Sequence, residues 1–487
     1  MDSIQEPRGR RRRERSGARK AAKILEGVGG VLICALVIAT PWMFGTTEEW
    51  SVRLMNIGSY CAGTIFLGAA ICNRVAGVQR EEERKWFRRG FFALNVAVLL
   101  FCAAAWWNWR ATFSVETRSF TYREEESLKW LPTTYDADLT RETFLTLLAC
   151  CIAFWSLRSW IAGGERRSTD AEDSAVFRNR RFQAIAWVLA LNGLAIALQG
   201  ILQRLSASPK LLWFRDSYSG FATGCFGPFS YRGNAAEYIN LLWPVALGLW
   251  WALTRERKRI QGDGRRFTDG PELMLIPATL VMIAASMITL SRAGAVVAVA
   301  ILFLIAGMFV LQKRLSKGVR LGIAVFVFVV LGGTWLLYSK ELKHRFTAAG
   351  VGDMSGRAEI YKNVDLMMKD FPAFGSGPGT FRSTYQMYRQ SPTDVWHGFL
   401  HDDWTETRIT FGWVGFGLIV VNLLALAWWM FARGRAPVPR EFTWCAAAGL
   451  LGALVHAKVD FPFQTYSILF TFVVIAAVLT TVSPERR

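Results

Sequence analysis

The chain has 487 residues, of which 52% are hydrophobic, and it contains 21 Trp and 34 Phe. This composition is too apolar for one soluble domain, whose surface must be largely polar, and it therefore excludes an ordinary soluble protein. The formal charge of +19 invites a nucleic-acid interpretation, but the placement of the charges along the chain argues against it.

Apolar runs of about 20 residues recur along the chain, and each is long enough to cross roughly 30 Å of hydrocarbon. The first run is longer than the apolar core of a typical signal peptide and no small-residue cleavage site follows it, so we expect it to remain as a span. The sequence thus predicts an all-α, polytopic integral membrane protein with about twelve transmembrane helices. The predicted spans are 24–45, 54–73, 89–107, 142–162, 183–203, 235–253, 273–291, 293–311, 319–338, 409–431, 441–458 and 465–482.

The basic residues indicate the orientation. The N-terminal tail, residues 1–23, contains "RGRRRRERSGARK". If this tail is cytoplasmic and the spans alternate, the short connections on the opposite side contain only Arg53 and Arg292. The other basic clusters then share the side of the tail; they lie at 74–89, 166–181, 255–266, 313–320 and 433–440. This is the positive-inside bias, so we expect both termini in the cytoplasm and a tail that serves topology and attraction to anionic lipid.

Three segments on the outer side are long, at about 108–141, 204–234 and 339–408. Long ordered connections are usually functional, so we look for chemistry on this face. The expected organisation is a bundle of spans one to nine over 24–338, a large helical periplasmic loop with the catalytic residues over 339–408, and three further spans over 409–482.

The stretch "ASMITLSRAGAVVAVAIL", residues 284–301, carries one arginine near the centre of about forty apolar residues. Such a run can be two spans joined by a tight turn at "SRAG", which moves Arg292 from mid-bilayer to the outer interface. Interfacial arginines often extend only to lipid headgroups. Because arginine is normally favoured on the inner side, binding of an anionic ligand is equally open. Arg357 is a second outer cation, for which ordinary solvation is the alternative.

The last long segment has structure of its own. "GRAEIYKNVDLMMKD" (356–370) has apolar residues at helical spacing, and "FPAFGSGPGTF" then supplies proline and glycines that end a helix. No strand precedes these glycines, so a tight turn is favoured over a phosphate-binding loop.

The next stretch, "VWHGFLHDDWTETRITFGWVGFG" (395–417), holds His397 and His401, two of only four histidines. Asp402 and Asp403 follow His401 directly. Carboxylates near an imidazole raise its basicity and can orient it as a general base. A surface histidine with local hydrogen bonds is the alternative that spacing alone leaves open.

These motifs, in this order, resemble the O-antigen ligase and O-antigen polymerase superfamily of bacterial envelope glycosyltransferases. The resemblance rests on "TLSRAG", "GRAEIYKNVDLMMKDFPAFGSGPGTF", "HDDWTETRITFGWVG", "GPFSYRGNAAEYINLLWPVALG" (227–248) and "LVHAKVDFPFQT" (454–465). It covers about 225–482, with a ligase-like core at 225–415. It implies a multi-span helical fold of the lipid-linked-sugar glycosyltransferase type, placed in the bacterial inner membrane with its active site on the periplasmic face.

The resemblance also implies a reaction. Such enzymes take a glycan from an undecaprenyl-diphosphate carrier and pass it to a hydroxyl of lipid A-core or of another glycan. By motif, Arg292 and Arg357 would bind the diphosphate of the carrier and His401 would activate the acceptor, with His397 as a rival for that role. Guanidinium groups suit a diphosphate and a histidine suits proton removal from a hydroxyl.

The sequence departs from the family pattern at two places. The family usually has Asn after the histidine and a glutamate shortly before the closing Gly-x-x-Gly, whereas this chain has Asp402 and Thr410. Glu406 would have to replace that glutamate, which its helical phase makes doubtful.

Further residues are candidates for substrate binding. Asn234 and Arg232 could bind the carrier or the acceptor. The equally open alternative is that they form a polar cap at the start of the following span. Asp402, Asp403 and His397 are candidates of the same kind. Arginines can neutralise a diphosphate without Mg²⁺ and the eight cysteines contain no CxxC pair, so we expect no metal and no cofactor, although the two aspartates leave a metal open.

His456 and Asp460 are four residues apart and are expected to share a helical face and pair.

The sequence does not separate a ligase from a polymerase of the same superfamily. A polysaccharide transporter or flippase is a third hypothesis. It is less favoured because the sequence shows no convincing internal repeat and because Arg158 is essentially the only charged residue in the middle of a predicted span.

Overall fold

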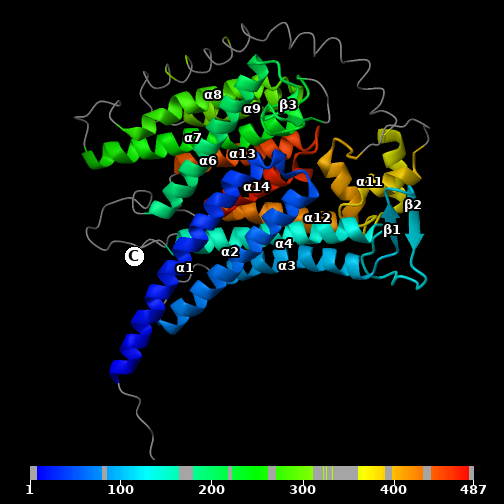
Figure 1. Ribbon diagram of the computed structural model, residues 1–487, viewed down its shortest axis with the longest axis horizontal. Coiled ribbons are helices and arrows are strands. Elements are labelled where there is room, and N and C mark those ends of the chain that lie inside the picture. Colours follow the sequence, from blue (N-terminus) through cyan, green and yellow to red (C-terminus); the bar gives the residue numbers. More distant parts are fainter. Residues whose placement is uncertain are drawn as a thin grey trace, which may run out of the picture.

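The computed structural model describes residues 8–78, 85–163, 179–217, 222–261, 270–310, 360–389, 398–431 and 440–481, together with residues 322, 325 and 332. In this part of the chain the structure is almost entirely helical (Figure 1). The helices of the N-terminal half are α1 (Arg8–Trp42), α2 (Glu49–Val75), α3 (Lys85–Trp107), α4 (Ala137–Ala162) and α6 (Arg180–Leu205). Those that follow are α7 (Arg232–Gln261), α8 (Leu275–Ile288), α9 (Arg292–Val310), α11 (Phe381–Thr384), α12 (Asp403–Phe431), α13 (Arg440–His456) and α14 (Tyr466–Leu479).

Eight helices among the described residues are long and apolar enough to cross a membrane. The chain is thus an all-α polytopic membrane protein, as predicted. Helices α7, α13 and α14 lie at three more of the predicted spans. The span predicted at 319–338 falls outside the described residues except for three isolated positions. The count of twelve spans therefore stays a prediction.

Four short 3₁₀ helices and two small hairpins complete the described elements. The 3₁₀ helices are η1 (Phe44–Thr46), η2 (Pro271–Met274), η3 (Tyr385–Met387) and η4 (Pro462–Gln464). Strand β1 (Ala111–Ser114) pairs antiparallel with β2 (Ser119–Tyr122), and β3 (Lys210–Leu211) pairs with β4 (Arg215–Asp216). Both hairpins fall in long segments predicted on the outer side, and β1 and β2 are at the same end of the view in Figure 1 as α11.

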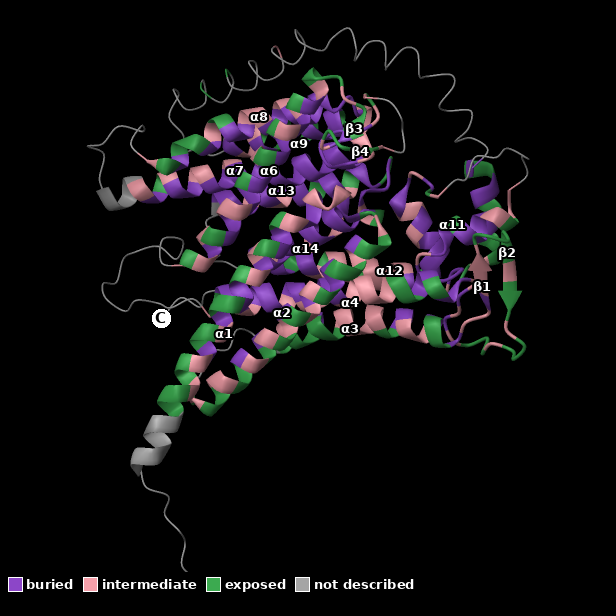
Figure 2. Ribbon diagram, in the orientation of Figure 1, coloured by how far each residue is buried: buried purple, intermediate pink, exposed green. Residues whose placement is uncertain are grey.

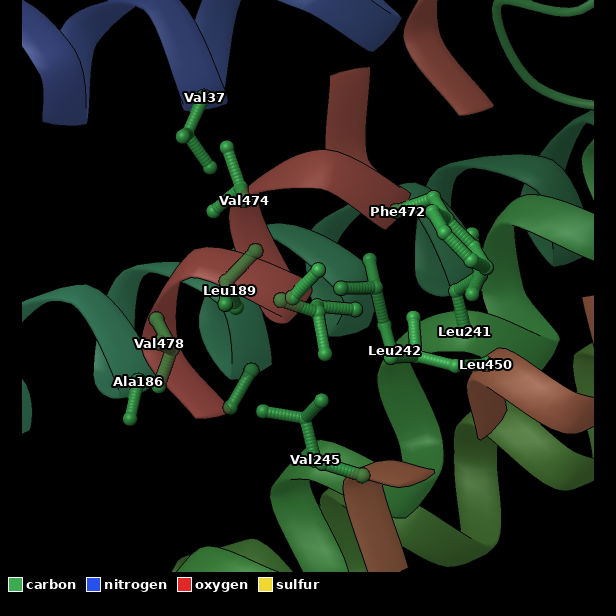
Figure 3. Packing of buried hydrophobic residues seen from close by; sticks show 14 of the residues in the cluster. Val37, Ala186, Leu189, Leu241, Leu242, Val245, Leu450, Phe472, Val474 and Val478 are labelled. Carbon is green, nitrogen blue, oxygen red and sulfur yellow. The ribbon is translucent and has the colours of Figure 1, made fainter. Parts of the chain in front are cut away.

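Helix α14 lies at the centre of the larger packed cluster (Figure 3). Val474 and Val478 of α14 lie among side chains of α1 and α6, while Phe472 lies beside Leu241 of α7. Figure 2 shows the buried residues gathered around α6, α7 and α13, and more exposed residues along α1 and α3. Lipid is as apolar as these side chains, so helix association within a bilayer depends on close van der Waals packing.

The turn at "SRAG" confirms the prediction of two spans. Helix α8 ends at Ile288 and α9 begins at Arg292. The backbone amide of Gly294 donates to the hydroxyl of Ser291 at 3.1 Å, so Ser291 caps α9. A Cβ on Gly294 would lie 2.3 Å from that of Ala236, which shows how closely this turn packs against α7.

The helix predicted within 356–370 is also observed, with residues 360–370 helical. Ile360, Val364 and Met367 face inward and form a small cluster with Phe381 and Ile409. The periodicity of the apolar residues therefore placed this helix correctly. Its predicted first residues, including Arg357, lie outside the described residues.

Candidate active site

A cavity of about 1020 Å³ lies between α3, α4, α12 and α14. Most of its wall is apolar and comes from the membrane helices, with Phe91, Val98, Leu99, Phe154, Leu423, Leu426, Phe472 and Val473 among the lining residues. Polar side chains also line it, and they include Glu142, Tyr231, Asn234, Arg382, His401, Asp403 and Glu406. A cavity of this kind suits a ligand that is polar at one end and apolar at the other.

His401 lies directly before α12 in an unusual backbone conformation. Its φ is +60°, in the left-handed region that L-residues rarely adopt. The next residue, Asp402, caps the helix by accepting from the amide of Thr405 at 3.1 Å. The side chain of His401 is 27% exposed and lines the cavity. Strained residues of this kind persist only where the surrounding structure holds them, often at functional sites.

His401 pairs with Asp460, 59 residues further along the chain. The imidazole Nδ1 lies 3.0 Å from Oδ1 of Asp460, and the backbone amide of Phe461 donates to the same oxygen at 3.1 Å. The other carboxylate oxygen accepts from the hydroxyl of Tyr231 at 2.9 Å. If Nδ1 carries its proton toward the carboxylate, Nε2 is left as the basic nitrogen.

The surroundings of Asp460 favour its charged form. Burial opposes ionisation of this carboxyl group, but hydrogen bonds and positive charge from His401 and His456 outweigh burial and lower the pKa of Asp460 below its ordinary value. Gly233, in the first turn of α7, allows the carboxylate to approach closely, because a Cβ there would lie 2.5 Å from Oδ2 of Asp460. An anionic Asp460 would stabilise a protonated His401.

Aromatic rings surround this histidine. Phe461 stacks on Phe399 with ring centroids 4.4 Å apart and on Tyr231 at 5.2 Å. The imidazole of His401 meets Phe461 edge-on at 4.7 Å. These rings fix the orientation of His401 and keep bulk water from one side of it.

The two aspartates after His401 attach the start of α12 to the connection between α13 and α14. Asp402 accepts from the ammonium group of Lys458 at 2.6 Å. Asp403 accepts from the amide of Phe463 at 2.8 Å, and its own amide donates to the carbonyl of Ala457 at 2.8 Å. The two aspartates therefore bring His401 beside Asp460. Their role as substrate-binding residues stays a prediction, and of the two only Asp403 is among the described lining residues.

Glu406 and Thr410, the two positions at which the family glutamate was considered, both line the cavity. Glu406 is buried, and one of its carboxylate oxygens accepts from the amide of Leu400 at 2.9 Å. The hydroxyl of Thr410 donates to the carbonyl of Glu406 at 2.8 Å. The helical phase that made Glu406 doubtful does not keep it from the cavity, because α12 begins at Asp403 and directs this first-turn side chain inward.

Asn234 lines the cavity from the first turn of α7, and its amide donates to the hydroxyl of Thr465 at 2.6 Å. The guanidinium of Arg232 donates to the carbonyl of Thr223 at 3.2 Å. Both residues thus have partners within the protein. Their binding of carrier or acceptor stays a prediction.

The predicted diphosphate-binding arginines are placed only in part. Arg292 begins α9 and is half-buried, and it is not among the described residues that line the cavity. The turn that contains Arg292 packs against Ala236 of α7, two residues after Asn234. Arg292 therefore lies at the same end of the bundle as His401. Arg357 and His397 lie outside the described residues. Arg382 of α11 is the one arginine or lysine among the described lining residues.

The glycine-rich turn after residue 370 packs into a break in α12. Gly412 has φ 63° and ψ −174°, which interrupts the helix. The amide of Gly377 donates to the carbonyl of Thr410 at 3.0 Å, and the amide of Trp413 donates to the carbonyl of Pro372 at 2.9 Å. The turn thereby satisfies backbone groups that the break leaves unpaired, a requirement within a membrane protein.

A buried pair of ionisable groups lies behind Asp460. Nε2 of His456, at the end of α13, is 3.8 Å from Oδ2 of Asp460, so the predicted pairing of these two residues is confirmed. Nδ1 of His456 contacts a carboxylate oxygen of Glu237 in α7. Within the part of the chain described here, no group of three or more His, Cys, Asp or Glu is arranged to hold a metal ion.

The comparison with known families bears on the region that runs from α8 into α12. Residues 277–420 match the family model described as O-antigen ligase. This match supports the predicted O-antigen ligase superfamily over the region that it covers. No curated protein and no solved structure matches the chain.

The match supports a bacterial membrane protein of a glycosyltransferase-like ligase or polymerase class, with a lipid-linked glycan and an acceptor as its general partners. The matched region contains Arg292, Arg357, His401 and Glu406. Asp460 lies beyond it, and the wider limits predicted above, 225–482 and 225–415, stay predictions.

Sequence reasoning missed several residues of the O-antigen ligase-like site. It paired Asp460 with His456 alone, and it did not single out Tyr231, Glu237 or Arg382. The signals were weak: Glu237 is one acidic residue in an apolar span, and Arg382 follows a glycine-rich turn. Only the packing of α7 and the α13–α14 connection against the start of α12 brings Tyr231 and Glu237 near His401, and only the placement of α11 puts Arg382 on the wall of the same cavity.

Proposed function

We propose that the protein is an O-antigen ligase-like membrane glycosyltransferase. It moves a glycan from an undecaprenyl-diphosphate carrier to a hydroxyl of lipid A-core or of another envelope acceptor. The family match supports the general class of reaction, whereas the donor, the acceptor and the roles of individual residues belong to the proposal. The active site is expected on the periplasmic face of the bacterial inner membrane.

The observation that carries this proposal is the His401–Asp460 pair at the wall of the cavity. Nδ1 of His401 lies 3.0 Å from the carboxylate of Asp460, and His401 lines a cavity of about 1020 Å³ whose wall is mostly apolar. A lipid-linked donor needs apolar surface for its chain and a polar region for its sugar and diphosphate. The transfer to a hydroxyl also needs a base at that polar region.

The proposed step is a displacement at the anomeric carbon of the donor. The acceptor oxygen attacks this carbon, and the bond from the carbon to the diphosphate oxygen breaks. His401 takes the hydroxyl proton on Nε2, and the carrier diphosphate leaves with the electron pair of the broken bond. Asp460 stabilises the imidazolium that forms, in the manner of an aspartate behind a catalytic histidine.

Cations at the polar region would stabilise the charge that develops on the leaving diphosphate. Arg292 and Arg357 are the residues that the family resemblance assigns to this role. Arg382 is a further candidate, because it is the described cation on the cavity wall. A guanidinium can bind two phosphate oxygens at once, which a lysine ammonium does not match.

The test is glycan transfer by purified protein in proteoliposomes, with a lipid-diphosphate-linked glycan as donor and a lipid A-core acceptor. We expect His401→Ala to lower the transfer rate about 10²- to 10⁴-fold, the usual contribution of a general base. His397→Ala is the matched comparison, since it removes the other histidine of the same segment and should leave most activity. Full transfer by well-expressed His401→Ala protein, or by both Arg292→Ala and Arg357→Ala proteins, would refute the proposal.

The product distinguishes the related functions. Glycan on the final acceptor indicates a ligase, whereas a longer carrier-linked chain indicates a polymerase. Uptake of the lipid-linked glycan without any covalent transfer would support a transporter instead.

A further inference from the structure

The pair formed by Glu237 and His456 lies deeper than the residues that reach the cavity. Glu237 and His456 are 0% exposed and Asp460 is 4% exposed. Glu237 comes from α7, His456 from the end of α13, and Asp460 from the turn that follows. Neither Glu237 nor His456 is among the described residues that line the cavity. They therefore cannot touch a substrate in that cavity, and any effect on the reaction has to pass through Asp460.

Burying two ionisable groups without a function is costly. An ionised carboxylate removed from water loses several kcal/mol or more unless it is paired, and a hydrophobic pair of similar volume is often at least as stable. In the described structure, Oε1 of Glu237 and Nε2 of His456 have no hydrogen-bond partner, although their other polar atoms contact each other. Stability alone thus gives a weak reason for this pair.

The pair begins a chain of contacts that leads to His401. Glu237 contacts Nδ1 of His456, the opposite ring nitrogen of His456 lies 3.8 Å from Oδ2 of Asp460, and Oδ1 of Asp460 lies 3.0 Å from His401. The two carboxylate oxygens of Asp460 therefore face different histidines. A positive charge on His456 would hold Oδ2 toward α13 and leave Oδ1 directed at His401.

Other ionisable groups near His401 are held by different partners. Asp402, Asp403 and Glu406, at the start of α12, accept from the amides of Thr405, Phe463 and Leu400, respectively. The charged and titratable groups around the His401–Asp460 pair are Glu142, Tyr231, Glu237, Arg382, Asp402, Asp403, Glu406, His456 and Lys458. Among these described groups, His456 is the histidine that contacts the other carboxylate oxygen of Asp460 from the one that faces His401, and it carries a positive charge when protonated.

We propose that Glu237 and His456 act as one positioning unit for the glycosyl transfer, in which Glu237 keeps His456 cationic and His456 fixes the orientation and effective charge of the Asp460 carboxylate that faces His401. This inference rests on the proposed function. Glu237 and His456 are positioning residues, and His401 remains the group that receives the proton of the acceptor. The unit also tunes the electrostatic effect of Asp460 on His401, because His456 partly balances the negative charge of Asp460.

The experiment measures kcat and acceptor KM in proteoliposomes across the pH range in which the wild type is active. In His456→Gln the negative charge of Asp460 is less balanced, so protonated His401 is favoured. We expect the acid limb of activity to move to higher pH by about one unit, the size of a charge interaction over several ångströms in a protein. We also expect a fall in kcat of about tenfold and little change in KM, because no contact with substrate is lost.

Glu237→Gln should move the acid limb in the same direction, since His456 loses the carboxylate that keeps it charged. The double variant, Glu237→Gln with His456→Gln, should shift it no further than His456→Gln alone, because the two residues act as one unit. This double variant contains neither buried charge, so it remains testable where a single variant leaves an unpaired charge and fails to accumulate.

Glu26→Gln is the matched control. Glu26 is also a buried carboxylate of a membrane helix, pairs with Arg181 at 2.8 Å, and is not among the described lining residues. It should keep the wild-type pH profile. An unchanged profile in the double variant, additive shifts from the two single variants, or an equal shift in Glu26→Gln would overturn the inference. A wild type that transfers no glycan would instead overturn the proposed function.

Discussion

At the scale of single residues, His401 is held by its backbone and its partners together. Its φ of +60° costs energy in an L-residue, of the order of 1–3 kcal/mol, and the capping by Asp402 and the attachment by Asp403 maintain that conformation. The same conformation lets Nδ1 reach Asp460, which comes from a distant part of the chain. The geometry of the site thus depends on a few close contacts among these residues, and single substitutions can test each contact.

The first prediction concerns the charge of Asp460. Asp460→Asn keeps the size of the side chain but removes the anion that stabilises a protonated His401. We expect kcat to fall at least about 100-fold, with a smaller change in the amount of folded protein. Transfer kinetics and size-exclusion chromatography in detergent measure the two quantities. Activity close to that of the wild type would show that His401 works without this carboxylate.

The second prediction concerns Gly233. A Cβ at this position would lie 2.4 Å from the ring of Tyr231 and 2.5 Å from Oδ2 of Asp460, so Gly233→Ala should push the carboxylate away from His401. We expect a loss of transfer activity of about tenfold or more, since small displacements at a reacting centre have large effects. Gly307→Ala is the control, because a Cβ there meets nothing within 4 Å. Equal activity in the two variants would contradict this account.

At the scale of elements, α12 is two helical pieces joined at Gly412. The turn of residues 372–377 supplies partners for carbonyls before the break and amides after it, so turn and helix form one structural unit. The turn and the helix approach each other so closely that each needs a glycine at the contact. A Cβ on Gly375 would lie 2.3 Å from the carbonyl oxygen of Thr410, and a Cβ on Gly412 would lie 2.3 Å from the carbonyl oxygen of Ala373. The glycines after residue 370 are therefore needed for a helix break more than 30 residues away.

The third prediction follows from that contact. Gly412→Ala places a side chain in a backbone region that is nearly restricted to glycine and also against Ala373. We expect destabilisation of about 1–3 kcal/mol or more, seen as a lower thermal unfolding midpoint in detergent. Gly417→Ala, five residues further along the same helix, meets nothing within 4 Å and should be neutral or stabilising. The prediction is wrong if the two variants unfold at the same temperature.

At the scale of the whole molecule, one large buried cluster joins most of the described helices and also borders the cavity. Helices α3, α4, α12 and α14 contribute both to this cluster and to the cavity wall. The connections that carry Tyr231, His401 and Asp460 meet at one end of this bundle. The positive-inside bias predicts that this end faces the periplasm.

The fourth prediction concerns that orientation. Thr117, between β1 and β2, and Val78, after α2, are both exposed, and they are expected on opposite sides of the membrane. In intact spheroplasts, a membrane-impermeant maleimide should label Thr117→Cys above the level of the parent protein and should label Val78→Cys only after the membrane is permeabilised. The reverse pattern would place the active site on the cytoplasmic face.

Much of this protein was predictable from its sequence because the signals are local. Hydrophobic length predicts membrane helices, a polar pair with a glycine in a long apolar run indicates the turn before Arg292, and apolar spacing indicates the helix at 360–370. The order of several motifs also indicated the superfamily that the family match supports, since motif order along a chain is a property of sequence alone.

Only the tertiary structure decided which side chains meet. Asp460 was expected to pair with His456, four residues away, but it also contacts His401, which is 59 residues distant. Glu237 and Tyr231 come to the same place from α7 and the segment before it. Glu406 reaches the cavity because α12 begins at Asp403 and directs this first-turn side chain inward. These contacts depend on how helices pack against one another, and neither hydrophobic periodicity nor motif spacing encodes that arrangement.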